Sequence, residues 1–181
     1  MKYLLLAIIL SSCTVTQVVK EPVSELKADW TNEEWTTILA NALKSSELAT
    51  MNITEVCGDK IQFYTMLLSS LARYESNHKP SSKYTEKFAD VNGNRVVSRG
   101  LLQLSKESVN GSRYRCGITD AEDLHDPKVN LECGVKVAAA LIKENGVLYS
   151  KSAPWKGLSR YWSPFRNKEK TKVMMNKAKC D

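Results

Sequence analysis

Apolar residues recur at helical spacing in three separate stretches of the chain. The first follows a helix-start signal at residues 31–34 (TNEE), and its apolar face comprises Trp35, Ile38, Leu39, Ala42 and Leu43. The second, residues 61–74, is apolar around most of its circumference, which indicates a buried helix. The third starts at Asp126 and Pro127 and stops at Gly146, which are typical helix boundaries. The pattern therefore predicts a mostly helical core.

A small sheet is predicted between the second and third helices. Residues 88–104 (FADVNGNRVVSRGLLQL) place Asn92 and Gly93 between two short segments, and this dipeptide is a strong signal for a hairpin turn. The segment does not fit a calcium-binding loop, because its glycine is misplaced and Leu101 stands where a glutamate ligand is needed. We therefore expect a mainly helical α+β domain with one β-hairpin.

The start of the chain predicts export. Residues 1–13 (MKYLLLAIILSSC) hold one positive side chain, an apolar run too short to span a bilayer, and then small residues. Residues 10–13 also resemble a bacterial lipoprotein box, in which the signal is cut before the cysteine and Cys13 carries the lipid. The alternative is an ordinary secretory signal with an incidental cysteine, and both interpretations export the protein.

Domain boundaries follow from this start. We expect a lipoprotein signal peptide over residues 1–12, a polar tether over residues 13–29 and one domain over residues 30–181. A lipid on Cys13 anchors the protein to a membrane, which predicts an outer-membrane lipoprotein facing the periplasm, or a secreted protein if the signal is ordinary. We expect a monomer.

Four cysteines remain after Cys13, and in an oxidising compartment an even number predicts two disulfides with three possible pairings. We favour Cys116 with Cys133, which closes a short loop, and Cys57 with Cys180, which ties the tail to the start of the core helix. The spacings match no zinc pattern, so neither a metal site nor a cofactor is expected.

The formal net charge of +6 suits an anionic polymer as a partner, although solubility alone is the commoner explanation for such a charge. An exported chain has little reason to meet nucleic acid. We therefore expect no nucleic-acid partner.

Glu75 is the first candidate for chemistry. It ends the second apolar stretch, in LARYESNHKP, and Pro80 limits how far the helix continues. A carboxyl group in apolar surroundings has a raised pKa and can deliver a proton near neutral pH. The structural alternative is that Glu75 caps the helix or pairs with Arg73, Lys79 or Arg99.

Several short motifs follow one another in a single order along the domain: Glu75-Ser76, then SRGLLQ at residues 98–103, then Asn130 with Gly134, then Tyr161-Trp162. Together they resemble those of the soluble lytic transglycosylases and goose-type lysozymes, over roughly residues 61–166. The chain departs from that pattern in Leu102, which replaces the usual methionine, and in a long segment between Glu75 and Gly100. The resemblance implies a lysozyme-like fold whose hairpin flanks an active-site cleft.

The resemblance also implies residue roles. Glu75 is the general acid and then the general base, and the expected substrate-binding residues are Ser76, Ser98, Gly100, Gln103 and Tyr161. Four of them also have an ordinary structural interpretation: Ser98 as a polar hairpin residue, Gly100 as a turn glycine, Gln103 as a helix-surface amide and Tyr161 as a core aromatic.

The implied reaction cleaves the β-1,4 bond between N-acetylmuramic acid and N-acetylglucosamine in peptidoglycan. A lytic transglycosylase needs one catalytic glutamate, because a hydroxyl of the sugar itself attacks and leaves an anhydro end. The long segment supplies Glu86 and Asp90, and either could activate water as the second carboxylate of a hydrolase. Asp90 lies beside the predicted turn, where aspartate is common for structural reasons. The alternatives are a non-catalytic wall-binding lipoprotein and a hydrolase of another amino-sugar polymer such as chitin.

Overall fold

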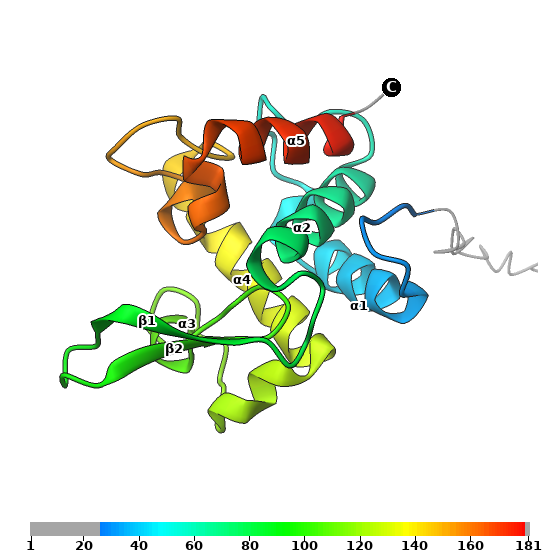
Figure 1. Ribbon diagram of the computed structural model, residues 1–181. Helices are drawn as coiled ribbons and strands as arrows, with labels where there is room; N and C mark the ends of the chain where they lie inside the picture. The colour runs from blue at the N-terminus through cyan, green and yellow to red at the C-terminus, as the bar shows by residue number, and fades with distance from the viewer. Residues whose placement is uncertain (1–25, 180–181) are drawn as a thin grey trace, which may run out of the picture.

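The computed structural model describes residues 26–179 (Figure 1). The signal peptide, the lipid on Cys13, most of the tether and Cys180 lie outside the described residues, and what the sequence predicted of them stays a prediction. No helix within residues 26–179 combines the length and the hydropathy needed to cross a bilayer.

The described chain consists mainly of helices. The longer ones are α1 (Glu33–Lys44), α2 (Lys60–Ser76), α4 (Pro127–Asn145) and α5 (Lys168–Ala178). The shorter ones are η2 (Glu47–Ala49), α3 (Lys106–Val109), η3 (Ala121–His125), η4 (Leu158–Arg160) and η5 (Ser163–Arg166). Strands β1 (Lys83–Ala89) and β2 (Arg95–Arg99) form a two-stranded antiparallel sheet. The predicted α+β class, with helices and one hairpin, is confirmed.

Local capping groups set the helix boundaries where the sequence predicted them. The Asn32 side chain accepts the Trp35 N–H at 3.0 Å and starts α1. The Asp126 side chain accepts the Lys128 N–H at 2.7 Å, and α4 then begins with a proline. Gly146, with a φ of 66°, ends α4 in the left-handed conformation. These boundaries could be predicted because each depends only on residues close in sequence.

Helix α2 is the centre of the core. Its side chains at Phe63, Leu67, Leu68 and Leu71 are fully buried or nearly so. Helices α1 and α5 pack against α2, and α1 also packs against α4. Figure 1 shows α2 in the middle of the helices with its C-terminal end toward the hairpin. The packing therefore fixes the end of α2, which carries Glu75, at the junction between the helices and the sheet.

The hairpin starts earlier than the sequence predicted. Strand β1 begins at Lys83 instead of near Phe88, and Lys83 pairs with Arg99. Most of β1 is exposed, so its sequence lacks the alternation of apolar and polar residues that marks a half-buried strand. The turn itself is as expected: Asp90 Oδ1 accepts the N–H groups of Asn92 and Asn94 at 2.9 and 2.8 Å.

Asn130 joins the hairpin to α4. Its side chain is fully buried, its Nδ2 donates to the carbonyls of Arg99 and Leu124 at 3.0 and 2.9 Å, and its Oδ1 accepts the Leu102 N–H at 2.8 Å. Gly100 makes this approach possible, because a Cβ there would lie 2.0 Å from the Leu124 carbonyl oxygen and its φ is +76°. One amide thus fixes the segment that follows β2.

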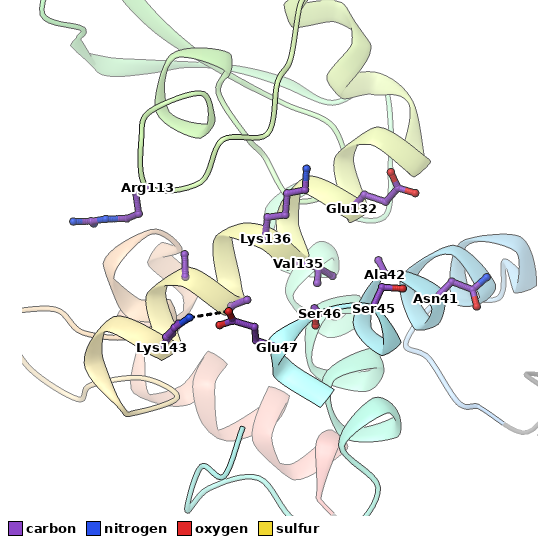
Figure 2. A pocket seen from close by; sticks show the side chains of 12 residues that line it. Asn41, Ala42, Ser45, Ser46, Glu47, Arg113, Glu132, Val135, Lys136 and Lys143 are labelled. Atoms are coloured by element: carbon purple, nitrogen blue, oxygen red, sulfur yellow. Dashed lines mark hydrogen bonds and ion pairs between the residues drawn. The ribbon is translucent and has the colours of Figure 1, made fainter. Parts of the chain in front are cut away.

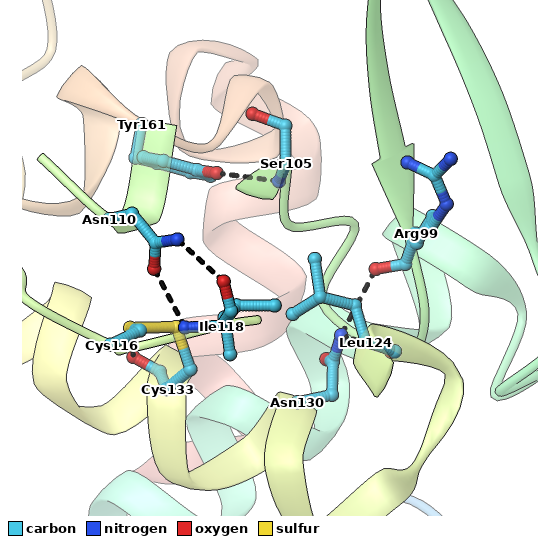
Figure 3. The surroundings of a disulfide bond; sticks show 9 residues. All are labelled: Arg99, Ser105, Asn110, Cys116, Ile118, Leu124, Asn130, Cys133 and Tyr161. Carbon is cyan, nitrogen blue, oxygen red and sulfur yellow. Dashed lines mark hydrogen bonds between the residues drawn. A yellow bond between two sulfur atoms is a disulfide. The ribbon is translucent and has the colours of Figure 1, made fainter. Parts of the chain in front are cut away.

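The predicted bond between Cys116 and Cys133 is present, and Figure 3 shows its surroundings. It fastens the loop after α3 to α4. Asn110 closes the same loop, because its Nδ2 donates to the Ile118 carbonyl at 2.7 Å and its Oδ1 accepts the Ile118 N–H at 2.8 Å. The other predicted pair includes Cys180, which lies outside the described residues.

Candidate active site

A cleft of about 320 Å³ lies where the end of α2, the hairpin and the η4–η5 segment meet. Helix α2 contributes Glu75, β1 contributes Glu86 and Phe88, and β2 contributes Val96 and Ser98. The opposite wall is formed by residues after β2 and by the η4–η5 segment, including Gln103, Ser105, Arg160, Tyr161, Trp162 and Arg166. The cleft thus collects polar side chains from four parts of the sequence.

Glu75 has the electrostatic properties of a proton donor. Burial and, to a smaller extent, the negative charge of Glu86 together raise the pKa of its carboxyl to about 7, against the opposing charges of Lys170 and Arg166. A group with a pKa near 7 is partly protonated at neutral pH and can both give and accept a proton. The side chain also borders the cleft, so that proton can reach a bound molecule.

Glu86 is a second carboxylate in the same cleft. Its Oε1 accepts a hydrogen bond from Ser98 Oγ at 2.8 Å, and both side chains line the cavity. Ser98 therefore holds the Glu86 carboxylate in place from the neighbouring strand. The hairpin thus brings a carboxylate to face Glu75.

Gln103 is fixed by its own segment. Its Nε2 donates to the carbonyls of Gly100 and Ser82 at 2.9 and 3.2 Å, and its backbone has a φ of 47°. The carbonyl Oε1 has no hydrogen-bond partner among residues 26–179, and the side chain lines the cleft. The fixed amide therefore presents an acceptor to a hydroxyl in the cavity.

Tyr161 is held on the opposite wall. Its hydroxyl accepts the Ser105 N–H at 3.3 Å (Figure 3), and its ring packs edge-on against Tyr114 with centroids 6.1 Å apart. Burial raises the pKa of the phenol to about 12, so the hydroxyl keeps its proton at all ordinary pH values. The neighbouring Trp162 donates from Nε1 to the Leu102 carbonyl at 2.9 Å. Tyr161 can therefore act as a fixed hydrogen-bond donor.

Three of the predicted site residues do not line the cleft. Ser76 turns its hydroxyl back into α2, where it donates to the Ala72 carbonyl at 3.0 Å. The Asp90 carboxylate is occupied by the N–H groups of the hairpin turn. Gly100 approaches the Leu124 carbonyl instead of a bound molecule. These residues shape the site but do not border the cavity.

Sequence reasoning missed other residues that line the cavity, above all Phe88, Arg160 and Arg166. Phe88 is 61% exposed, and its side chain lines the cavity together with that of Glu86, within the stretch of β1 where the strand register shifts. The register shift interrupts the alternation of side chains along β1, so no local signal in the sequence indicates Phe88. Its exposed ring offers an apolar surface to a sugar face.

A larger hollow of about 660 Å³ lies between α1 and α4 and shares no lining residue with the cleft. Figure 2 shows its ion pair, in which Lys143 Nζ lies 2.7 Å from Glu47 Oε1. Glu132 and Lys136 also line it, so its charges are mixed and favour no single class of ion. Within residues 26–179, no three acidic, histidine or cysteine side chains cluster to hold a metal ion.

The family model described as the transglycosylase SLT domain matches residues 54–172. The chain belongs to this family. The lysozyme-like fold implied by the sequence motifs is thereby confirmed, and the SLT domain assigns the chain to proteins that cleave peptidoglycan. Because peptidoglycan lies in the cell wall, membership of this family also implies an exported protein.

Solved structures agree with the SLT assignment. The chain is similar to wild-type form 2 of Bd0314 DslA at 35% identity, with a TM-score of 0.76 over 84% of this chain and 94% of that one. Two DslA variants, each with one glutamate replaced by glutamine, match at 36% identity and a TM-score of 0.73, over 80% of this chain and 87% of theirs. No curated protein matches the chain.

Proposed function

We propose that this SLT protein cleaves peptidoglycan glycan strands at the β-1,4 bond between N-acetylmuramic acid and N-acetylglucosamine, by lytic transglycosylation. The observation that carries the proposal is Glu75, a carboxyl group with a pKa of about 7 on the wall of a cleft between the helices and the hairpin. The family supplies the substrate class, and the electrostatics of this one group supply the chemistry.

In the proposed reaction, protonated Glu75 gives its proton to the oxygen of the glycosidic bond as that bond breaks. The resulting carboxylate then takes the proton from a hydroxyl of the muramoyl sugar, and the oxygen of that hydroxyl attacks the anomeric carbon to form the anhydro end. The nearby charges of Lys170 and Arg166 stabilise the carboxylate between the two transfers. Gln103 Oε1 and the Tyr161 hydroxyl, which line the same cleft, hold the sugar by hydrogen bonds.

The test is digestion of purified sacculi with the protein, followed by mass analysis of the released fragments. We expect fragments with anhydro-muramoyl ends. Fragments heavier by one water molecule indicate hydrolysis, and binding without release indicates a wall-binding protein. Chitin oligosaccharides are the control substrate, and their cleavage at an equal rate would contradict a preference for peptidoglycan.

Hydrolysis is the second candidate, and Glu86 is the observation that favours it. Glu86 lines the cavity together with Glu75 and is positioned by Ser98, as a carboxylate that activates water must be. The two glutamates replaced in the DslA variants lie eleven residues apart in that protein, which is also the separation of Glu75 and Glu86 here. Both carboxylates are therefore candidates for a direct role.

Replacing Glu86 with glutamine separates the two candidates. In the wild type, kcat/KM should fall as pH rises through about 7, because Glu75 then loses the proton it must donate. In the transglycosylation mechanism, Glu86→Gln keeps kcat within about tenfold and moves this decline to lower pH, because the charge that raises the pKa of Glu75 is gone. A hydrolase instead loses roughly a hundredfold or more in turnover. Exposed Glu34, changed to glutamine, is the matched control.

A further inference from the structure

A second pocket, of about 370 Å³, lies beside the cleft, and Arg166 lines both cavities. Its walls come from the loop after α4, from η5 and from α5. This volume is within the range of small-molecule sites, about 300–1,000 Å³. The proposed active site and this pocket therefore share one lining side chain.

The floor of the pocket is apolar. The rings of Tyr149 and Phe165 lie with centroids 6.2 Å apart and an interplanar angle of 32°, and Met175 of α5 completes the floor. Phe165 is only 2% exposed, so the floor is an extension of the domain core. Such a surface is suited to small aliphatic groups.

The rim of the pocket is positively charged. Lys151, Lys168, Lys172 and Arg166 line it, and no acidic residue does. None of the ion pairs within residues 26–179 involves any of these four side chains. The pocket therefore gathers positive charge that the described chain does not pair.

The stability of α5 does not explain this arrangement. Lys168 is the first residue of the helix, where the helix dipole disfavours a cation. Lys172 lies one turn later on the same face, and like charges at this spacing repel. Both positions slightly destabilise the free helix, whereas an anion bound in the pocket would stabilise them.

Arg166, which lines both cavities, is held in place by hydrogen bonds. Its Nε donates to the Ser159 carbonyl at 2.7 Å and its NH2 donates to the Arg160 carbonyl at 2.9 Å, while the guanidinium lies 5.7 Å from the centroid of the Trp155 ring. These contacts leave the guanidinium little freedom. Its charge reaches both Glu75 in the cleft and the neighbouring pocket.

We propose that this pocket binds the carboxylate-bearing peptide attached to the muramoyl sugar held in the cleft. The inference rests on the proposed function, because only a glycan strand with peptide branches places such a group next to a bound sugar. Peptides of this kind combine small aliphatic side chains with free carboxylates, which match the apolar floor and the cationic rim. A chitin chain carries neither group.

The test compares two soluble substrates, namely glycan strands with their peptides and the same strands after an amidase has removed them. The variant Lys168→Glu/Lys172→Glu reverses two of the rim charges. We expect its KM for peptide-bearing strands to rise roughly fivefold to tenfold, because two charge contacts become repulsive, with kcat and the KM for bare strands unchanged. The matched control, Lys27→Glu/Lys136→Glu, makes the same change of net charge at exposed residues outside both cavities and should behave as wild type.

Two results overturn the inference while the proposed function stands. The first is that the rim variant has wild-type kinetics on both substrates. The second is that its KM rises equally for both substrates, which indicates that the lysines attract the polymer in general. Failure of the wild type to cleave either substrate overturns the proposed function itself and, with it, this inference. Equal melting temperatures of both variants and the wild type establish that folding is not the cause of a kinetic change.

Discussion

Replacing Glu75 with glutamine should lower the rate of peptidoglycan cleavage by about a thousandfold, because a positioned general acid and base contributes roughly 10²–10⁴ to a rate. Glutamine has nearly the same shape but cannot donate a proton to the leaving oxygen. The measurement is the release of soluble fragments from labelled sacculi at pH 6 to 7. Glu34→Gln, on an exposed part of α1, is the control and should retain full activity. Release at the wild-type rate by the Glu75 variant would remove this residue from the mechanism.

The same substitution should change stability in a pH-dependent way. The pKa of Glu75 in the folded protein is about 7, compared with an ordinary value of 4.5, so the folded state holds this proton more tightly than the unfolded state. The wild type therefore loses stability as pH rises from about 4.5 through 7. The glutamine variant has no carboxyl at this position and does not show this loss. We expect the two proteins to melt alike near pH 4 and the variant to melt at a higher temperature at pH 8. A difference in melting temperature that stays constant from pH 4 to pH 8 would contradict the raised pKa of the Glu75 carboxyl.

Replacing Asn130 with alanine should cause the second large effect, a loss of about 4 kcal/mol in the free energy of unfolding. The change leaves the Leu102 N–H and the Leu124 carbonyl without their buried partner, and each such group costs about 1–3 kcal/mol, whereas the Arg99 carbonyl still accepts the Leu104 N–H at 2.9 Å. For a domain of this size the melting temperature should fall by roughly 10 °C.

Thermal and urea unfolding measure the effect. Asn41→Ala, at an exposed position of α1, is the matched control and should change the free energy of unfolding by no more than about 0.5 kcal/mol. Equal stability of the Asn130 and Asn41 variants would show that the buried amide does not hold the hairpin to α4.

The parts of the fold that could be predicted are those that depend on neighbours in sequence. Asn32, Asp126 and Gly146 set helix boundaries through contacts within a few residues, and Asp90 similarly arranges its own turn. The start of β1 was missed because an exposed strand needs no apolar alternation. Only its pairing with β2 in the folded protein identifies β1 as a strand.

Only part of the site could be predicted, because several of its residues depend on contacts between distant parts of the sequence. Glu75 could be found because it ends an apolar helical stretch and begins the ordered series of motifs at residues 75–76, 98–103, 130–134 and 161–162. Ser76 and Gly100 belong to the same motifs, yet the structure uses them inside the fold, and nothing local indicates the direction of a hydroxyl or the neighbour of a glycine. Phe88 and Arg166 reach the cleft through the pairing of strands and the packing of the tail, which no short segment encodes.

The bond between Cys116 and Cys133 makes the wall that carries Tyr161 dependent on the redox state of the surroundings. Tyr114, which supports the Tyr161 ring, lies two residues before Cys116 on the fastened loop. Glutathione and thioredoxin keep such cysteines reduced in the cytoplasm. A newly synthesised chain therefore forms this disulfide only after leaving that compartment. Protein prepared for assays accordingly needs expression or refolding under oxidising conditions.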